Sequence, residues 1–261
     1  MKEIKDYLVR ELQDFFKKAN FSKATLGMSG GLDSAVVFAL AVDALGKDNV
    51  LPVLMPSMYS SQHSVDDSIE MAKNLETKYE IINITNVYNS ILESLSPIFN
   101  GAPFDVTEEN IQARIRGLLL MAISNKQRRL VLNTSNKSEL SVGYGTLYGD
   151  LCGSISVIGD LYKTEVFELA NYINSEKEII PKNIINKIPS AELRPDQKDT
   201  DSLPDYNILD TVLKAYIDNH KDAETIVKEG FDKNIVERIV TLVKNSSFKS
   251  LQVPPKISIN L

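Results

Sequence analysis

The chain has 261 residues, 43% of them hydrophobic, which is enough to bury one core and predicts a single α/β domain. Its formal net charge of −6 argues against a nucleic-acid-binding protein, because such proteins usually present a basic face. The single cysteine excludes an intramolecular disulfide and the longest apolar run, residues 118–123, is too short to span a bilayer, so we expect a cytoplasmic protein without nucleic-acid or membrane partners.

Apolar periodicity predicts alternating helices and strands along the first half of the chain. Helices are expected at residues 3–19, 32 to about 46, 60–76 with Ser60 or Ser61 at its start, 86–99 as far as Pro97, and 107 to about 126. Strands are expected at residues 24–28, 50–55, 80–84 and 130–133. Pro52 within the second strand predicts an edge strand or a strand start. Thr107 is the expected N-cap of the helix that follows the loop at 100–106.

The second half of the chain is predicted to be mainly helical. Short helical pieces flank residues 143–153, and longer helices are expected at 163–175, 207–219, 222–229 and 232–245. Residues 181–206 are rich in Pro, Asp and Lys and predict a mobile loop. Strands alternating with helices predict a doubly wound parallel sheet flanked by helices, with helical segments at the C-terminal end. Ligands bind such sheets at the carboxyl ends of the strands.

The most informative stretch is Ser-Gly-Gly-Leu-Asp-Ser at residues 29–34, between the first strand and its helix. A glycine turn that opens a helix directs several backbone N–H groups at one point, which suits a phosphate. Asp33 beside an anion indicates a divalent cation between them. A bare Gly-Gly pair is more simply a tight turn, but the full hexapeptide is more specific. It is not a Walker A loop, since no Gly-Lys-Ser/Thr follows.

A second polar constellation follows the strand at 130–133. Glu139 is a candidate to share a Mg²⁺ ion with Asp33, and stabilisation of a helix N-terminus by its charge is an equally good interpretation. Lys163, at a predicted helix start, is a candidate to neutralise phosphate, and taken alone it reads as a solvated surface lysine. The position of both residues after the fourth strand favours the ligand-binding interpretation, because the carboxyl end of that strand meets the phosphate turn.

The hexapeptide resembles the pyrophosphate loop (PP-loop) of the ATP pyrophosphatases. Four further strings resemble one family of that superfamily, the ammonia-dependent NAD synthetases; they lie at residues 109–116, 133–139, 144–150 and 190–197. The match covers nearly the whole chain in order, whereas other PP-loop enzymes share only the first motif.

The resemblance assigns roles residue by residue. It implies ATP-binding positions at Gly27, Met28, Ser29, Gly30, Gly31, Leu32, Asp33, Ser34, Thr134, Lys163 and Ser190. Asp33 and Glu139 match the two Mg²⁺ ligands, while Asp150 and Lys163 match catalytic positions. Deamido-NAD-binding positions are implied at Arg114, Asp150 and Lys249. Two residues depart from the pattern of many relatives, because Leu147 stands where they have a lysine and Phe248 where they have a histidine.

The resemblance also implies the reaction. Deamido-NAD is adenylylated by ATP with release of pyrophosphate, and ammonia then displaces AMP to give NAD, in the last step of NAD biosynthesis. Mg²⁺ is the expected cofactor, ATP the co-substrate, and a homodimer the expected assembly. No glutaminase domain is expected in this chain, and Cys152 reads as a packing residue rather than a nucleophile.

The same resemblance suggests an internal layout. We expect an ATP pyrophosphatase core at about 20–180 and C-terminal helices at 207–246. Residues 187–206 are expected to form a lid that orders over ATP, with a disordered surface loop as the competing interpretation.

Two other functions compete with this one. A tRNA-modifying ATP pyrophosphatase would need a basic RNA-binding face and often extra cysteines, which the composition disfavours. A non-catalytic nucleotide-binding module would keep the PP-loop but would not need Glu139, Asp150 and Lys163 as well.

Overall fold

The computed structural model describes residues 1–259 and contains a parallel five-stranded sheet in the order β3-β2-β1-β4-β5. Its strands are β1 (Ala24–Met28), β2 (Val50–Leu54), β3 (Glu80–Ile81), β4 (Leu130–Asn133) and β5 (Ile155–Ser156). The predicted doubly wound parallel sheet is therefore confirmed. Chain order reverses between β1 and β4, so the carboxyl ends of these two strands frame the expected ligand crevice.

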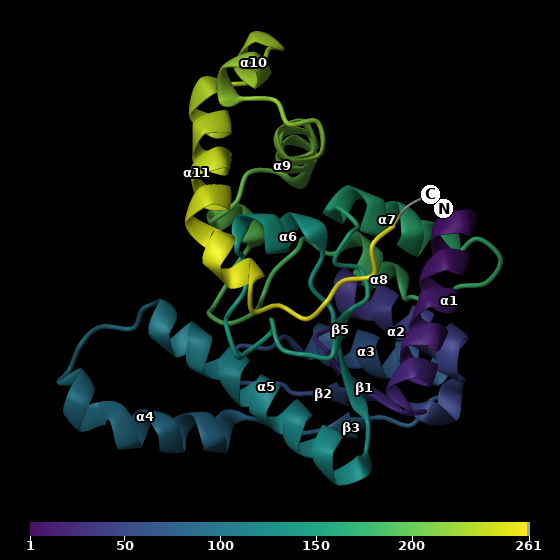
Figure 1. Ribbon diagram of the computed structural model, residues 1–261. Helices are drawn as coiled ribbons and strands as arrows, with labels where there is room; N and C mark the ends of the chain where they lie inside the picture. Colours follow the sequence, from purple (N-terminus) through teal and green to yellow (C-terminus); the bar gives the residue numbers. More distant parts are fainter. Residues whose placement is uncertain (260–261) are drawn as a thin grey trace.

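Five helices cover one face of the sheet (Figure 1). They are α1 (Lys2–Ala19), α2 (Leu32–Leu45), α3 (Gln62–Asn74), α7 (Lys163–Ile173) and α8 (Lys182–Asn186). Leu26 of β1 and Leu54 of β2 are buried in this layer together with Phe38 of α2. Helix α2 is buried from Ser34 to Ala41, as expected for a helix enclosed between the sheet and α1.

Two helices cover the opposite face, α4 (Thr85–Phe99) and α5 (Val106–Gln127). Leu51 and Val53 of β2 point into this second layer and pack with Ile115 of α5 and Tyr88 of α4. The alternation of Leu51 and Val53 with Leu54 follows the two-residue period of a strand that is buried on both faces.

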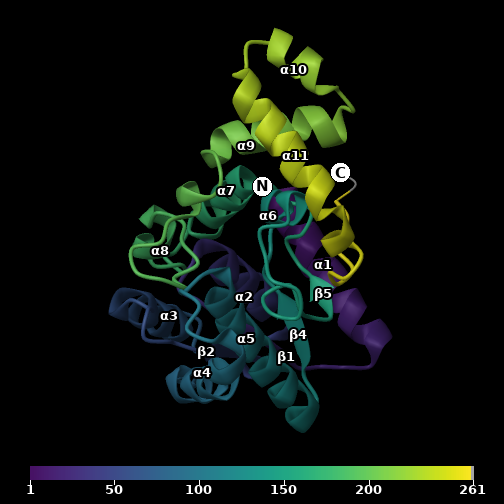
Figure 2. The ribbon, with the colours of Figure 1, turned by 90° about the vertical axis from the view of Figure 1, so that its left-hand side faces the viewer.

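The C-terminal helices build a third apolar cluster beside the sheet (Figure 2). They are α9 (Tyr206–Leu213), which continues into a π-helical turn at Lys214–Asp218, α10 (Ala223–Lys228) and α11 (Lys233–Ser250), and they pack near α6 (Lys137–Val142). The chain then returns to the sheet, where Ser156 of β5 donates its N–H to Pro255 O at 2.9 Å and Ile257 donates to Ser156 O at 3.2 Å. This return covers the exposed edge of β5.

Two expectations about local structure are wrong. Helix α5 begins at Val106, with Asp105 rather than Thr107 as its N-cap, and Asp105 and Glu108 form a reciprocal capping box. Strand β2 is internal rather than an edge strand, yet it contains Pro52. Leu54 O accepts a hydrogen bond from Ile82 N–H, so the backbone of Leu54 faces β3. The backbone of Pro52, two residues earlier, faces the same neighbour. Strand β3 pairs only with Val53 and Leu54, so it has no acceptor opposite Pro52 and the missing N–H costs no hydrogen bond.

Other elements differ in extent. Strand β3 has two residues rather than the five expected at 80–84, and β5 was not expected at all. Helix α4 continues through Pro97 to Phe99. The segment 181–206 is not wholly a loop, because it contains α8 and a 3₁₀ turn at Asp199–Asp201. No helix within residues 1–259 combines the length and apolar character needed to cross a lipid bilayer.

Candidate active site

The turn at residues 29–34 joins β1 to α2 at the carboxyl edge of the sheet. Gly30 has φ of +76°, and a Cβ there would lie 2.5 Å from Ser64 O, so only glycine fits. Serine hydroxyls hold the turn in shape, since Ser34 Oγ donates to Gly31 O at 2.9 Å and Gly31 N–H donates to Ser29 Oγ at 3.1 Å. Gly31 is the N-cap of α2, so the helix N-terminus adds partial positive charge at this point.

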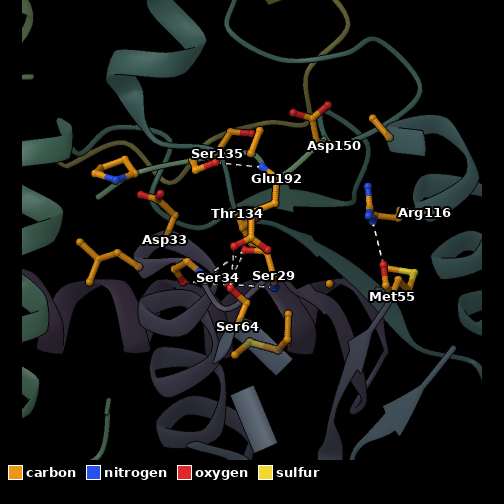
Figure 3. A pocket seen from close by; sticks show the side chains of 18 of the residues that line it. Ser29, Asp33, Ser34, Met55, Ser64, Arg116, Thr134, Ser135, Asp150 and Glu192 are labelled. Atoms are coloured by element: carbon orange, nitrogen blue, oxygen red, sulfur yellow. Dashed lines mark hydrogen bonds between the residues drawn. The ribbon is translucent and has the colours of Figure 1, made fainter. Parts of the chain in front are cut away.

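A cavity of about 270 Å³ lies above this turn. Most of the predicted site residues line it: Gly27, Met28, Ser29, Gly31, Leu32, Asp33, Ser34, Thr134, Glu139, Asp150, Lys163 and Ser190. The predicted residues outside its wall are Gly30, Arg114 and Lys249. Figure 3 shows Asp33 and Thr134 near Ser29 and Ser34 of the turn, with Asp150 farther from it. The structure thus gathers residues from β1, β4, α6, α7 and the 187–206 segment around one hollow.

Asp33 and Lys163 form an ion pair at the base of this cavity. Lys163 is almost fully buried at the first position of α7, and its backbone N–H donates to Ser138 Oγ at 2.9 Å. Asn136 Nδ2 donates to the other Asp33 oxygen at 3.0 Å. The interpretation of Lys163 as a solvated surface residue is therefore wrong, because its ammonium lies inside the site.

Glu139 completes this charged group. It sits at the third position of α6, where its backbone N–H and side chain form a capping box with Asn136, so its expected place at a helix N-terminus is confirmed. Burial and the nearby Asp33 carboxylate raise the pKa of Glu139 well above its usual value. Burial lowers the pKa of Lys163, but Asp33 and Glu139 outweigh it and the net pKa is raised, so its ammonium stays charged.

Asp33 and Glu139 suit a divalent cation of the Mg²⁺ type. Mg²⁺ commonly takes one or two protein carboxylates and completes its shell with water and phosphate oxygens. No group of three or more His, Cys, Asp or Glu side chains within residues 1–259 has the arrangement of a metal site. A cation held here would therefore need a ligand such as a triphosphate, in agreement with the adjacent anion turn.

Asp199 also lines the cavity and was not expected to do so. Its carboxylate accepts from Tyr206 Oη at 2.9 Å and from Tyr144 Oη at 3.2 Å, which fixes the side chain within the wall. Burial raises the pKa of Asp199, although these hydrogen bonds and Lys163 oppose the shift. Asp199 adds a third acidic group near Lys163 and Glu139.

Asp150 faces the cavity from the loop at 143–153. Thr146 N–H donates to its carboxylate at 2.7 Å, and Asn133 Nδ2 at the end of β4 donates to its carbonyl at 2.8 Å. The side chain is open to the cavity, yet protein surrounds it, and this burial raises the pKa of Asp150. A carboxylate of raised pKa is suited to proton transfer.

Arg114 and Lys249 support the same loop from outside the cavity. Arg114 of α5 donates through Nε to Leu147 O at 3.3 Å. Lys249 of α11 donates through Nζ to Gly143 O at 2.8 Å and Gly145 O at 2.7 Å. In this structure both cations bind loop carbonyls, and neither joins the group around Asp33.

The segment at 187–193 lines one side of the cavity. Glu192 of this segment reaches α3, where it accepts from Ser61 Oγ at 2.9 Å and Ser64 Oγ at 2.8 Å, and it pairs with Lys187 Nζ at 2.6 Å. Burial raises the pKa of Glu192, but the Lys187 and serine hydrogen bonds outweigh it, so its net pKa is lowered. We call this contact of Glu192 with Lys187, Ser61 and Ser64 the latch.

The same segment is also attached to α5. Arg194 bridges Glu109 at 3.1 Å and Asp201 at 3.0 Å, and Gln112 Nε2 donates to Leu193 O at 2.8 Å. These contacts attach the segment to α5, in addition to the contacts of Glu192 with α3.

Several cavity residues were missed from the sequence, chiefly Arg116, Lys187, Glu192 and Asp199. Arg116 could have been found from the helical pattern. Residues two apart on a helix point to nearly opposite sides, so Arg114 and Arg116 cannot face the same way. Ala113, Gly117 and Leu120 mark the inward side, which is the side of Arg116. Asp199 gives no local signal, since it reaches the site only through the path of the 187–206 segment.

The sheet order, the Ser-Gly-Gly turn and the cavity at the strand ends define the class: a nucleotide-binding enzyme fold of the PP-loop type. The family model described as NAD synthase matches residues 4–254. The chain therefore belongs to the NAD synthase family.

Individual relatives agree with this assignment. A glutamine-dependent NAD(+) synthetase from Acinetobacter baylyi is 50% identical over 260 residues, 98% of this chain and 48% of that protein. A solved NMN synthetase from Francisella tularensis matches with a TM-score of 0.81 at 29% identity, covering 100% of this chain and 98% of that one. A solved NH₃-dependent NAD synthetase from Campylobacter jejuni matches with a TM-score of 0.78 at 30% identity, with the same coverage. The chain spans about half the length of the curated relatives it matches.

Proposed function

We propose that this protein amidates deamido-NAD with ammonia at the expense of ATP, giving NAD, AMP and pyrophosphate. The observation that carries the proposal is one cavity in which the phosphate turn, the Asp33–Lys163 pair and Asp150 meet. The turn offers backbone N–H groups to the phosphate tail, and Lys163 brings a buried positive charge next to it.

The chemistry proceeds in two steps. The nicotinate carboxylate attacks the α-phosphorus of ATP, and the bond to the departing pyrophosphate breaks, which leaves an acyl-adenylate. Ammonia then attacks the acyl carbon and AMP leaves. A free carboxylate is a poor acyl donor, because oxide would have to leave, and adenylylation supplies a better leaving group. The protein mainly positions two anions and neutralises charge.

The predicted site residues have distinct roles in this scheme. Lys163 and the turn amides stabilise the leaving pyrophosphate, with Thr134 and Ser190 beside them as further ATP contacts. Mg²⁺ bound by Asp33, Glu139 and phosphate oxygens would neutralise charge on the triphosphate. Asp150 takes the proton that ammonium must lose to become a nucleophile, in keeping with its raised pKa. Arg114 and Lys249 bind deamido-NAD at the outer side of the 143–150 loop.

We infer that ammonia itself reaches this cavity. A glutaminase needs an activated nucleophile, and Cys152, the single cysteine of the chain, is unsuitable because burial raises the pKa of its thiol. Nitrogen from glutamine would have to be released as ammonia elsewhere. The relative from Campylobacter jejuni is described as NH₃-dependent and those from Acinetobacter baylyi and Synechocystis as glutamine-dependent, so relatives with either nitrogen source share this family.

The layout of the chain is part of the same proposal. The ATP pyrophosphatase core occupies about residues 20–180, the C-terminal helices 207–246, and residues 187–206 serve as the lid that excludes water from the adenylate. The active form is a homodimer that associates through the exposed apolar side chains of α4 and α5.

The test measures products with purified protein, ATP, Mg²⁺ and deamido-NAD. Ammonium should give equal amounts of NAD, AMP and pyrophosphate, and glutamine free of ammonium should give almost none. Pyrophosphate released with AMP while deamido-NAD stays unchanged would overturn the proposal, as would equally fast synthesis from glutamine.

A second substrate deserves the same assay, because the solved NMN synthetase has the highest TM-score of the structures described above. The chemistry is identical if nicotinic acid mononucleotide replaces deamido-NAD, since both present a nicotinate carboxylate. A kcat/KM for the mononucleotide above that for deamido-NAD would reassign the substrate while leaving the reaction unchanged.

A further inference from the structure

The cavity contains three cationic side chains, and two of them already have carboxylate partners. Lys163 pairs with Asp33, and Lys187 pairs with Glu192. Arg116 is different, because within residues 1–259 its guanidinium makes neither an ion pair nor any hydrogen bond besides Nε to Met55 O at 3.0 Å. Its two terminal nitrogens therefore keep their hydrogen-bonding capacity for something else.

The position of Arg116 is fixed by its surroundings. The Nε bond to Met55 anchors the guanidinium to the segment just after β2, and the adjacent Gly117 packs so closely on the Asp150 loop that a Cβ would lie 2.8 Å from Tyr148 O. Figure 3 shows Arg116 bound to Met55 and on the same side of the cavity as Asp150, while Glu192 extends toward Ser64. The group is largely prearranged, so binding a ligand costs little side-chain ordering.

Burial lowers the pKa of Arg116 to about 10, which still leaves it fully charged at neutral pH. The carboxylates of Asp150 and Glu192 oppose this shift, but neither forms an ion pair with Arg116 within residues 1–259. A desolvated guanidinium without a direct partner is stabilised further when a ligand supplies a carboxylate in contact with it. A planar guanidinium with free terminal N–H groups suits a carboxylate, which it can bind through two parallel hydrogen bonds.

Two anions must enter this cavity for the proposed reaction, the ATP tail and the nicotinate carboxylate. The turn and Lys163 provide for the first, at the β1 side of the cavity. We propose that Arg116 binds the carboxylate of the acyl substrate beside Asp150 and positions it for adenylylation. This inference rests on the proposed function and adds to it the residue that distinguishes an acid substrate from its amide product.

The distinction between acid and amide gives the test. Deamido-NAD and NAD differ only in carboxylate against carboxamide, so their dissociation constants are measured by calorimetry for wild type, Arg116→Met and Arg116→Lys. Wild type should bind deamido-NAD more tightly than NAD. Arg116→Met should lose roughly 10- to 100-fold affinity for deamido-NAD, the range expected for hydrogen bonds to a charged group, and little affinity for NAD. Arg116→Lys should retain part of the preference, because it keeps the charge but not the planar fork.

Arg129→Met is the matched control. Arg129 is also partly buried and donates to backbone carbonyls, of Ala24 at 3.1 Å and Asn49 at 3.2 Å, but it lies outside the cavity wall. The Arg129→Met substitution should lower the Tm without changing the ratio of the dissociation constants for deamido-NAD and NAD. Deamido-NAD-dependent pyrophosphate release without ammonium should fall in Arg116→Met and persist in Arg129→Met.

The outcomes separate the inference from the function it rests on. If wild type forms no NAD, the proposed function fails. If wild type forms NAD but Arg116→Met keeps the acid-over-amide ratio, or loses affinity for both ligands equally, Arg116 has only a structural role and the inference is overturned. Should Arg116→Met not fold, the ratio measured with Arg116→Lys decides in the same way.

Discussion

At the scale of single residues, the two candidate metal-binding carboxylates should respond differently to neutral substitution. Asp33→Asn removes the ion-pair partner of the almost fully buried Lys163 and leaves only the more distant Glu139 and Asp199 to compensate its charge, so we expect a loss of roughly 3 kcal/mol of stability together with activity. Glu139→Gln keeps the shape of a side chain whose charge is unfavourable where it lies, so the fold should stay stable. Both should lower kcat by roughly 100-fold or more.

Thermal unfolding and steady-state kinetics check this difference. A Glu139→Gln protein with near-normal kcat would remove Glu139 from the site. An Asp33→Asn protein as stable as wild type would show that the ion pair with Lys163 contributes no stability.

Gly30 offers a second prediction at this scale. Gly30→Ala combines the strain of positive φ with a Cβ 2.5 Å from Ser64 O, and should destabilise the protein by roughly 3 kcal/mol or distort the turn enough to weaken ATP binding. Gly101→Ala is the matched control, since Gly101 has the same φ of +76° but nothing within 4 Å. Both variants share the strain of positive φ, so the difference between them in Tm and in ATP affinity measures the clash of the added Cβ with Ser64. Equal effects of the two substitutions would contradict a role for this clash.

At the scale of elements, the latch should hold the lid in a pH-dependent way. Glu192 has a lowered pKa, so the latch contributes stability that is complete above the ordinary glutamate value of 4.5 and is lost as pH falls through the lower folded value. Glu192→Gln should therefore lower the Tm at pH 7 and lower it progressively less as pH falls below about 4.5. Limited proteolysis within 187–201 should be faster in Glu192→Gln at pH 7.

The control for this prediction is Glu178→Gln, which removes an exposed pair with Lys182 at 3.4 Å and should leave both readouts unchanged. A Tm difference between wild type and Glu192→Gln that is constant over the pH range would show that the latch does not act through its charge.

An element could be predicted from the sequence where neighbouring residues determine it, and not where residues distant in the sequence do. Strands β1 and β4 were predicted with their observed bounds, because each is a short apolar run ended by turn residues. Strand β5 was missed, because its two residues pair with β4 on one side and receive the tail at Pro255 and Ile257 on the other, and no local pattern records such distant partners. The residues of the candidate site also fall into those set by a local motif and those set by distant parts of the chain. The turn at 29–34 is readable from one hexapeptide, whereas Asp199 and Glu192 enter the cavity only through the path of the lid.

At the scale of the whole molecule, α4 and α5 form the outer layer on one side of the sheet (Figure 1). Several large apolar side chains of this layer are exposed. Those on the two helices and their connection are Val87, Ile98, Phe104, Val106, Leu118 and Met121, and Leu118 is 65% exposed. Several exposed apolar side chains on one pair of helices mark an interaction surface more often than single exposed residues do. A second copy of the chain is the occupant proposed above.

Leu118→Glu should therefore convert a dimer into a monomer, because it would place two carboxylates in an apolar contact between symmetry-related helices. Sedimentation equilibrium over a range of concentrations measures this change. Leu251→Glu is the matched control, since Leu251 is 86% exposed at the end of α11 and belongs to neither α4 nor α5, and it should leave the mass unchanged. A monomeric wild type, or a Leu118→Glu dimer as tight as wild type, would show that the exposed face of α4 and α5 does not join two copies.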